Sequence, residues 1–202
     1  MPRTPSPNRR NSRRGRGGSR PVRLYLLLAC EGTTEELYFD AVRKTFGVRG
    51  EVTARGRDPL GVVDEAHRIR LRIQRVNPGP VEVWCVFDGV GPDITPALQA
   101  AAEYGFQVIV STPCFEIWPL LHFRPSHRYI DCGEAAKREL RQYIPDYTES
   151  MPIYHEYLRD RETKAISNLG LLRTHHAGHE SGDYANPSTN ADALLLRLKN
   201  GT

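Results

Sequence analysis

Acidic side chains follow three apolar segments of the sequence, each close to the point where the segment ends. Glu31 comes directly after LYLLLAC, Asp88 closes VEVWCVFD, and Glu116 lies just beyond FQVIVST. Segments this apolar are typical of strands that are buried on both faces of a parallel sheet. Because the carboxyl ends of parallel strands lie at one edge, where open α/β sheets bind ligands, we expect the three carboxylates to converge there.

The expected convergence of these carboxylates indicates that a cation binds between them. They repel one another, so their pKa values rise unless a positive charge neutralises them. Oxygen ligands favour Mg²⁺ or Mn²⁺ over zinc. We therefore predict metal binding by Glu31, Asp88 and Glu116, with nearby Glu35 as a further ligand and Glu31 or Glu35 as a general acid/base. Such an ion suits phosphodiester cleavage. The alternative is that each acid merely caps a helix in water.

His122 is a second candidate for catalysis. It ends the segment PCFEIWPLLH, which also contains Glu116. A histidine here would protonate a leaving group or orient a phosphate. The alternative is a hydrogen-bonded histidine that packs beside its apolar neighbours. Farther along, His175 and His179 have the spacing of a zinc pair on a helix, but the glycine and polar residues around them predict a loop.

The elements that position these residues alternate between strands and helices, which predicts an α/β fold with a parallel sheet of about four strands flanked by helices. Thr33 is expected to cap a helix, with Glu36 completing a capping box. Asp58 is expected to cap a helix that runs towards Val76, and Gly105 to close another.

The chain divides into three ranges. Residues 1–21 form an arm, residues 22–128 form the α/β core, and residues 129–202 form a helical extension of the same domain that packs on the sheet or its edge. Beyond about Tyr129 no further strand is expected, and the segment NPST is expected to be a turn in which Ser188 or Thr189 caps the last helix.

The arm carries much of the positive charge. The chain has 28 Lys and Arg against 24 Asp and Glu, and seven of the arginines lie within residues 1–20 without any acid. Its Pro, Gly, Ser and Arg composition predicts disorder. Arginines on a flexible segment suit phosphate backbones, so we predict nucleic-acid binding by six of them, with a solvated tail as the alternative. The six are Arg9, Arg10, Arg13, Arg14, Arg16 and Arg20.

The apolar run before Cys30 superficially matches a lipoprotein signal, but it is shorter than a signal core, and an amphipathic helix follows it directly. The four cysteines are widely separated without a Cys-x-x-Cys pair, which indicates buried thiols in a reducing compartment. No segment has the length of a membrane span. We therefore expect a cytoplasmic protein without membrane association.

Four segments together resemble the RloB-like family: LLLACEGTTEELYFDAVRK, VWCVFD, STPCFEIWPLLHF and NPSTNADALLLRL. The resemblance covers nearly the whole chain after the arm. It implies a Toprim-type (topoisomerase-primase) domain, found beside bacterial restriction and phage-defence genes, and metal-dependent cleavage of nucleic acid. It also implies that Glu31 is the general acid/base and that an Asp-x-Asp pair holds Mg²⁺.

The sequence departs from that pair. Asp88 occupies the first position, but Val90 occupies the second, and Asp93 is the acid that would substitute. The leading hypothesis is a nuclease that acts on RNA, tRNA included, or on DNA in anti-phage defence. The alternative is a catalytically degenerate nucleic-acid-binding module or a partner subunit of a defence complex. No Walker phosphate loop is present, so any ATP-driven step would need a partner protein.

Overall fold

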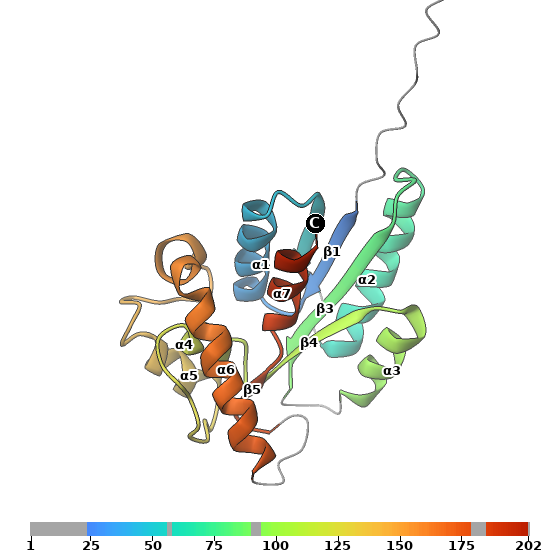
Figure 1. Ribbon diagram of the computed structural model, residues 1–202. Coiled ribbons are helices and arrows are strands. Elements are labelled where there is room, and N and C mark those ends of the chain that lie inside the picture. Colours follow the sequence, from blue (N-terminus) through green and yellow to red (C-terminus); the bar gives the residue numbers. More distant parts are fainter. Residues whose placement is uncertain (1–23, 56–57, 90–93, 179–184, 202) are drawn as a thin grey trace, which may run out of the picture.

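The structure is a computed structural model that describes residues 24–55, 58–89, 94–178 and 185–201. Strands and helices alternate through the first half, as the sequence predicts (Figure 1). The elements are β1 (Tyr25–Cys30), α1 (Thr33–Thr45), β2 (Gly50–Ala54), α2 (Pro59–Gln74), β3 (Val81–Asp88), α3 (Thr95–Tyr104), β4 (Gln107–Thr112), α4 (Ile117–Leu121), α5 (Gly133–Leu140), a π-helical turn (Tyr154–Leu158), a 3₁₀ turn (Arg159–Arg161), α6 (Glu162–Ala177), β5 (Ser188–Thr189) and α7 (Asp192–Asn200).

The strands form one sheet in the order β2-β1-β3-β4-β5. The first four are parallel, which confirms the expected sheet of four parallel strands. The fifth, β5, pairs antiparallel with β4 and corrects the expectation that no strand follows Tyr129. A two-residue strand is too short to show alternation in the sequence. It is held by Asn190, whose side chain accepts from the Val110 N–H at 2.7 Å and donates to the Val108 carbonyl at 2.9 Å.

Helices cover both faces of the sheet, so the fold has three layers (Figure 1). Successive strand residues point to opposite faces. Leu26 and Leu28 of β1 pack in the core shared with α1 and α4, whereas Leu27 and Ala29 pack against α2 and α3. Both faces of β1 are therefore buried, which explains its nearly continuous apolar sequence.

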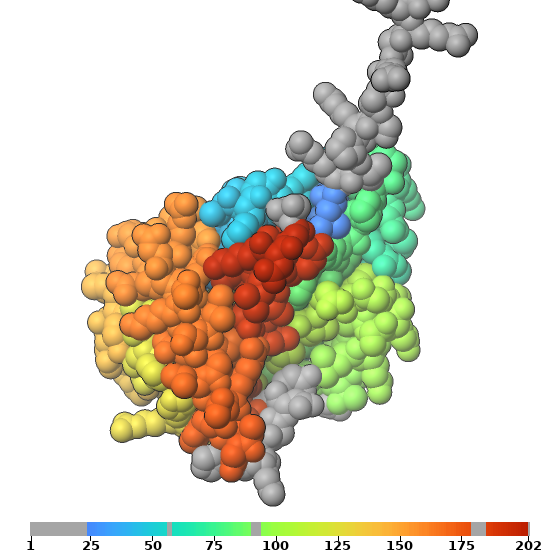
Figure 2. Space-filling model, in the orientation of Figure 1, coloured from blue at the N-terminus to red at the C-terminus, as the bar shows by residue number. Residues whose placement is uncertain are grey.

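The C-terminal extension belongs to the first of these two cores. Leu140 of α5, Leu169 of α6 and Leu195 of α7 lie in the same buried cluster as Leu28 and Trp118. In Figure 2 the surface of α6 and α7, in orange and red, lies directly beside the blue and green surface of the elements from β1 to β4. The extension thus covers one face of the sheet and reaches its carboxyl edge.

The ends of the helices test the capping predictions. Asp58 accepts a hydrogen bond from the Gly61 N–H at 2.9 Å, and Gly105 closes α3 with φ of 69°, both as predicted. The capping box at Thr33 is wrong, because Gly32 is the residue that precedes α1 and no side chain caps it. The loop predicted at His175 is also wrong, since α6 continues to Ala177.

Candidate functional site

The strand order reverses between β1 and β3. The chain leaves β1 for β2 on one side and then returns to β3 and β4 on the other. Open α/β sheets bind ligands in the crevice outside the carboxyl ends at such a reversal. Glu31 follows β1 and Asp88 ends β3, so the two acids flank this point. The Asp88 N–H also donates to Glu31 Oε2 at 3.3 Å.

A cavity of about 200 Å³ opens at this edge. It contains all four of the predicted acids that the structure describes: Glu31, Glu35, Asp88 and Glu116. The structure therefore brings together side chains from three strand ends and from the first turn of α1. Their roles as metal ligands or as acid/base stay predictions. Asp93, Val90, His179 and the arginine arm lie outside the described residues.

Glu35 is held against the end of β1. It lies in the first turn of α1, and its residue is 5% exposed. A Cβ atom at Gly32 would lie 2.5 Å from Glu35 Oε2, so a glycine is needed for the carboxylate to turn back over its own helix end. Burial raises the pKa of Glu35 to about 7; its own backbone N–H opposes this shift, and Glu116 and Glu31 add to it.

The pKa of Asp88 is raised further than that of Glu35. Burial raises the pKa of Asp88 to about 8, with further increases from Glu35, Glu116 and Glu31 and an opposing contribution from the Phe115 N–H. Its Oδ1 atom is buried without a hydrogen-bond partner among the described residues. Burial also raises the pKa of Glu31, and the bond from the Asp88 N–H opposes that shift. The cavity therefore favours a proton or a cation over free carboxylates.

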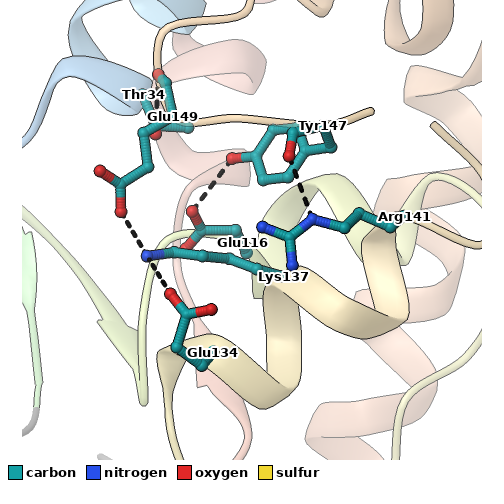
Figure 3. Close-up of polar contacts among 7 residues, drawn as sticks. All are labelled: Thr34, Glu116, Glu134, Lys137, Arg141, Tyr147 and Glu149. Atoms are coloured by element: carbon teal, nitrogen blue, oxygen red, sulfur yellow. Dashed lines mark hydrogen bonds and ion pairs between the residues drawn. The ribbon is translucent and has the colours of Figure 1, made fainter. Parts of the chain in front are cut away.

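Glu116 connects the sheet edge to the C-terminal extension. It precedes α4, is 4% exposed, and accepts a hydrogen bond from the Tyr147 hydroxyl at 3.0 Å (Figure 3). Thr34 of α1 donates its hydroxyl to the Glu149 carbonyl at 3.2 Å. The segment around Tyr147 and Glu149 thus forms a wall of the cavity opposite the strand ends.

Three residues of this wall were missed by the sequence analysis: Lys137, Tyr147 and Glu149. Lys137 and Glu149 line the cavity, and Tyr147 bonds to Glu116. Lys137 lies on an amphipathic helix, where a lysine in the sequence looks like any solvated surface charge. The other two residues do not follow a strand, so they lack the sequence signal that marked the other acids.

His122 lies elsewhere. It is fully buried, and its Nδ1 atom is 2.9 Å from the Trp118 carbonyl oxygen. Its ring packs edge-on against Tyr38 and Trp118, and burial lowers its pKa to about 4. It does not line the cavity that holds the acids. The position matches the packed-histidine alternative and gives no support to a catalytic role, because a substrate has no access to the ring.

The donor set of the cavity fits a hard divalent cation in its chemistry. All four acids offer oxygen, and the unpartnered Asp88 Oδ1 is the kind of buried atom that a cation would satisfy. Within the described ranges, however, no group of three or more His, Cys, Asp or Glu side chains is arranged to hold an ion. Mg²⁺ commonly binds through one or two carboxylates and completes its shell with water and phosphate, which is compatible with this arrangement.

The fold and site define an α/β protein with a carboxylate-lined cavity at the strand reversal of a mostly parallel sheet. The family described as RloB-like protein matches residues 26–198, and the chain belongs to that family. No curated protein matches the chain. Among solved structures, a de novo designed Rossmann fold protein is similar, with 22% identity, a TM-score of 0.31, and coverage of 45% of this chain and 85% of the designed one.

In the part of the chain that the structure describes, none of the helices combines the length and the apolar character needed to span a bilayer. All four cysteines are free thiols; Cys30, Cys85 and Cys114 are buried, and Cys132 is exposed.

Proposed function

We propose that this protein is a Mg²⁺- or Mn²⁺-dependent nuclease that cleaves phosphodiester bonds in RNA, tRNA included, or in DNA. The observation that carries the proposal is the convergence of four carboxylates in one cavity at the strand reversal. Two of them have pKa values raised to about 7 and about 8. Carboxylates that are this unfavourable when ionised are compensated by a divalent cation, and the chemistry best served by such a cation is phosphoryl transfer.

The four acids take different roles in this proposal. Asp88, Glu116 and Glu35 hold the ion, because Glu116 and Glu35 are buried and Asp88 has an oxygen without a hydrogen-bond partner among the described residues. Glu31 is half-buried and acts as the general acid/base, since it follows β1 directly at the strand reversal and its carboxylate accepts a hydrogen bond from the backbone N–H of Asp88. A bound Mg²⁺ would supply polarisation of the phosphate and stabilisation of the leaving oxygen.

Membership of the RloB-like family supports a proposal about the type of domain and its biological role. Through the resemblance described above, we propose a Toprim-type domain that acts in the bacterial cytoplasm in anti-phage defence, together with a partner protein of the defence system. Three buried free thiols suit a reducing compartment. The arginine arm is proposed to add affinity for the phosphate backbone.

Calorimetric titration with MgCl₂ and MnCl₂ tests the metal site. The wild-type protein should release or absorb heat on binding, and Asp88→Asn, which keeps the shape of the side chain, should lose that heat. Glu82→Gln at the opposite end of β3 is a matched control and should keep it. Equal binding by the wild-type protein and Asp88→Asn would exclude Asp88 as a ligand.

The rival function is a binding module that has lost its metal. The observation in its favour is that the described residues present no assembled set of three ligands, while Val90 occupies the place of the second aspartate. Such a module should bind nucleic acid equally well in EDTA and in Mg²⁺, with a steep dependence on salt that disappears when residues 1–20 are deleted. Cleavage of the bound nucleic acid only when Mg²⁺ is present would exclude it.

A further inference from the structure

We propose that Lys137 is the residue that binds the phosphate of the substrate in the acidic cavity, and that Glu149 is the displaceable counter-ion that occupies it in the free protein. The inference rests on the proposed function and names a substrate contact of the same site. It follows from the position of Lys137, from its partners, and from the charge of the cavity around it.

Lys137 reaches the cavity from the extension. It lies on α5, opposite the strand ends, and lines the same space as Glu31, Asp88 and Glu116. Figure 3 shows its side chain extending beside Glu116 to a point between Glu134 and Glu149. The helix that carries it is fixed by Ala136 and Leu140, both fully buried in the core. The ammonium group is therefore presented on a rigid element.

The charge around the cavity gives Lys137 its importance. Among the described residues that line the cavity, Lys137 is the one with a positive side chain, and five lining residues are acids: Glu31, Glu35, Asp88, Glu116 and Glu149. A phosphodiester that approached these carboxylates without a cation would be repelled. Lys137 supplies a fixed cation on the wall opposite the strand ends, so the substrate phosphate would lie between two positive groups.

The partners of Lys137 can be displaced. Its ammonium bonds to Glu149 and lies 3.2 Å from Glu134 Oε1. The side chain of Lys137 is 18% exposed, whereas those of Glu149 and Glu134 are 60% and 71% exposed. Ion pairs with partners this exposed contribute little free energy, so a phosphate can replace them at small cost. By contrast, Glu116 is buried and held by Tyr147, and it stays in place.

A second interpretation is that the pair between Lys137 and Glu149 only ties the segment around Tyr147 to α5. The two interpretations predict opposite effects for Glu149→Gln. If Glu149 competes with phosphate, its neutralisation frees Lys137 and tightens binding. If the pair is only a tie, neutralising either partner loosens the same wall, and both variants weaken binding.

The test is binding of a short fluorescein-labelled RNA or DNA oligonucleotide to the full chain, measured by anisotropy in EDTA and in CaCl₂. Lys137→Met keeps the apolar stem and should weaken binding about tenfold, the value of one lost charge-assisted hydrogen bond. Lys44→Met removes the same charge from the exposed end of α1 and is the control, with little change expected. Glu149→Gln should tighten binding by about twofold or more.

The outcomes separate this inference from the proposed function. Equal binding by Lys137→Met and Lys44→Met overturns the role of Lys137, even if the wild-type protein binds Mg²⁺ and cleaves. Weaker binding by both Lys137→Met and Glu149→Gln also overturns it, in favour of a structural tie. A specific loss with Lys137→Met in a protein that binds no divalent ion would overturn the nuclease proposal and leave the phosphate contact standing.

Discussion

The two edges of the sheet contain cavities of different size and different charge: among the described residues, one acid and one arginine line the first, and five acids and one lysine line the second. At the amino edge, a cavity of about 320 Å³ is lined by Arg70 and Glu82, among others. Arg70 donates to the Tyr104 carbonyl at 3.0 Å and lies over the Phe106 ring, while Glu82 accepts from Trp84 and pairs with Arg197. The carboxyl edge has a smaller cavity, of about 200 Å³, in which four acids face one another.

The charged groups of the two cavities differ in their partners. At the amino edge the charged groups already have partners within the chain, so a ligand would have to displace them. At the carboxyl edge, Glu31, Glu35, Asp88 and Glu116 form no ion pair with a described residue, and an outside cation would lower the free energy of the folded state. The smaller cavity is therefore the better candidate for chemistry.

The largest expected effect comes from making the same substitution, glutamate to glutamine, at each of the two edges. Glu31→Gln at the carboxyl edge should lower the rate of Mg²⁺-dependent cleavage by about 100-fold or more, because it removes the general acid/base. Glu82→Gln at the amino edge should leave the rate unchanged. The measurement is cleavage of labelled RNA and DNA followed on gels. Undiminished cleavage by Glu31→Gln would mean that Glu31 is not the general acid/base and that the carboxyl edge is not distinguished by it.

An intermediate effect concerns pH and the stability of the metal-free protein. The pKa of Glu35 rises from 4.5 to about 7 on folding, and that of Asp88 from 3.8 to about 8, so the folded state binds more protons than the unfolded state. The free energy of unfolding should therefore fall as pH increases through this range. Glu35→Gln should gain about 1 kcal/mol or more over the wild-type protein by pH 8.

Urea denaturation at a series of pH values in EDTA measures this effect. The wild-type protein should lose stability between pH 3.8 and about pH 8, and Glu35→Gln should show a shallower decline between pH 4.5 and about pH 7. An identical decline in both proteins would mean that Glu35 does not carry an unfavourable charge in the cavity.

The smallest expected effect lies at the amino edge. Arg197 and Glu82 are 3.0 Å apart, and their side chains are 39% and 20% exposed. Because exposed pairs are screened by water, Arg197→Met should lower the free energy of unfolding by less than about 1 kcal/mol. The same urea experiments at neutral pH give the value. A loss of several kcal/mol would show that the pairs of this edge stabilise the fold far more than their exposure indicates.

Much of the fold follows from the sequence because its signals are local. Apolar runs predicted three of the four parallel strands, Asp58 marked a helix start by its side chain, and Gly105 marked a helix end by its backbone freedom. The convergence of Glu31, Asp88 and Glu116 followed from strand direction alone. A one-residue error at Thr33 reflects the fact that a glycine also precedes helices, without any side-chain signal.

The other wall of the site has no such signal. Lys137 and Glu149 reach the cavity through the packing of α5 and the segment after it, which depends on contacts between distant parts of the chain. The sequence left the place of His122 open between a catalytic and a packed position for the same reason. In the structure its ring lies in the core, where it packs against Tyr38 and Trp118.

The hydrogen bond from Tyr147 to Glu116 has a consequence for how the protein is made. The cavity draws on residues from Glu31 to Glu149, so a chain still on the ribosome has its first acids in place long before the hydroxyl that orients Glu116 has been synthesised. Nascent or truncated chains that stop short of Tyr147 would therefore lack a finished site.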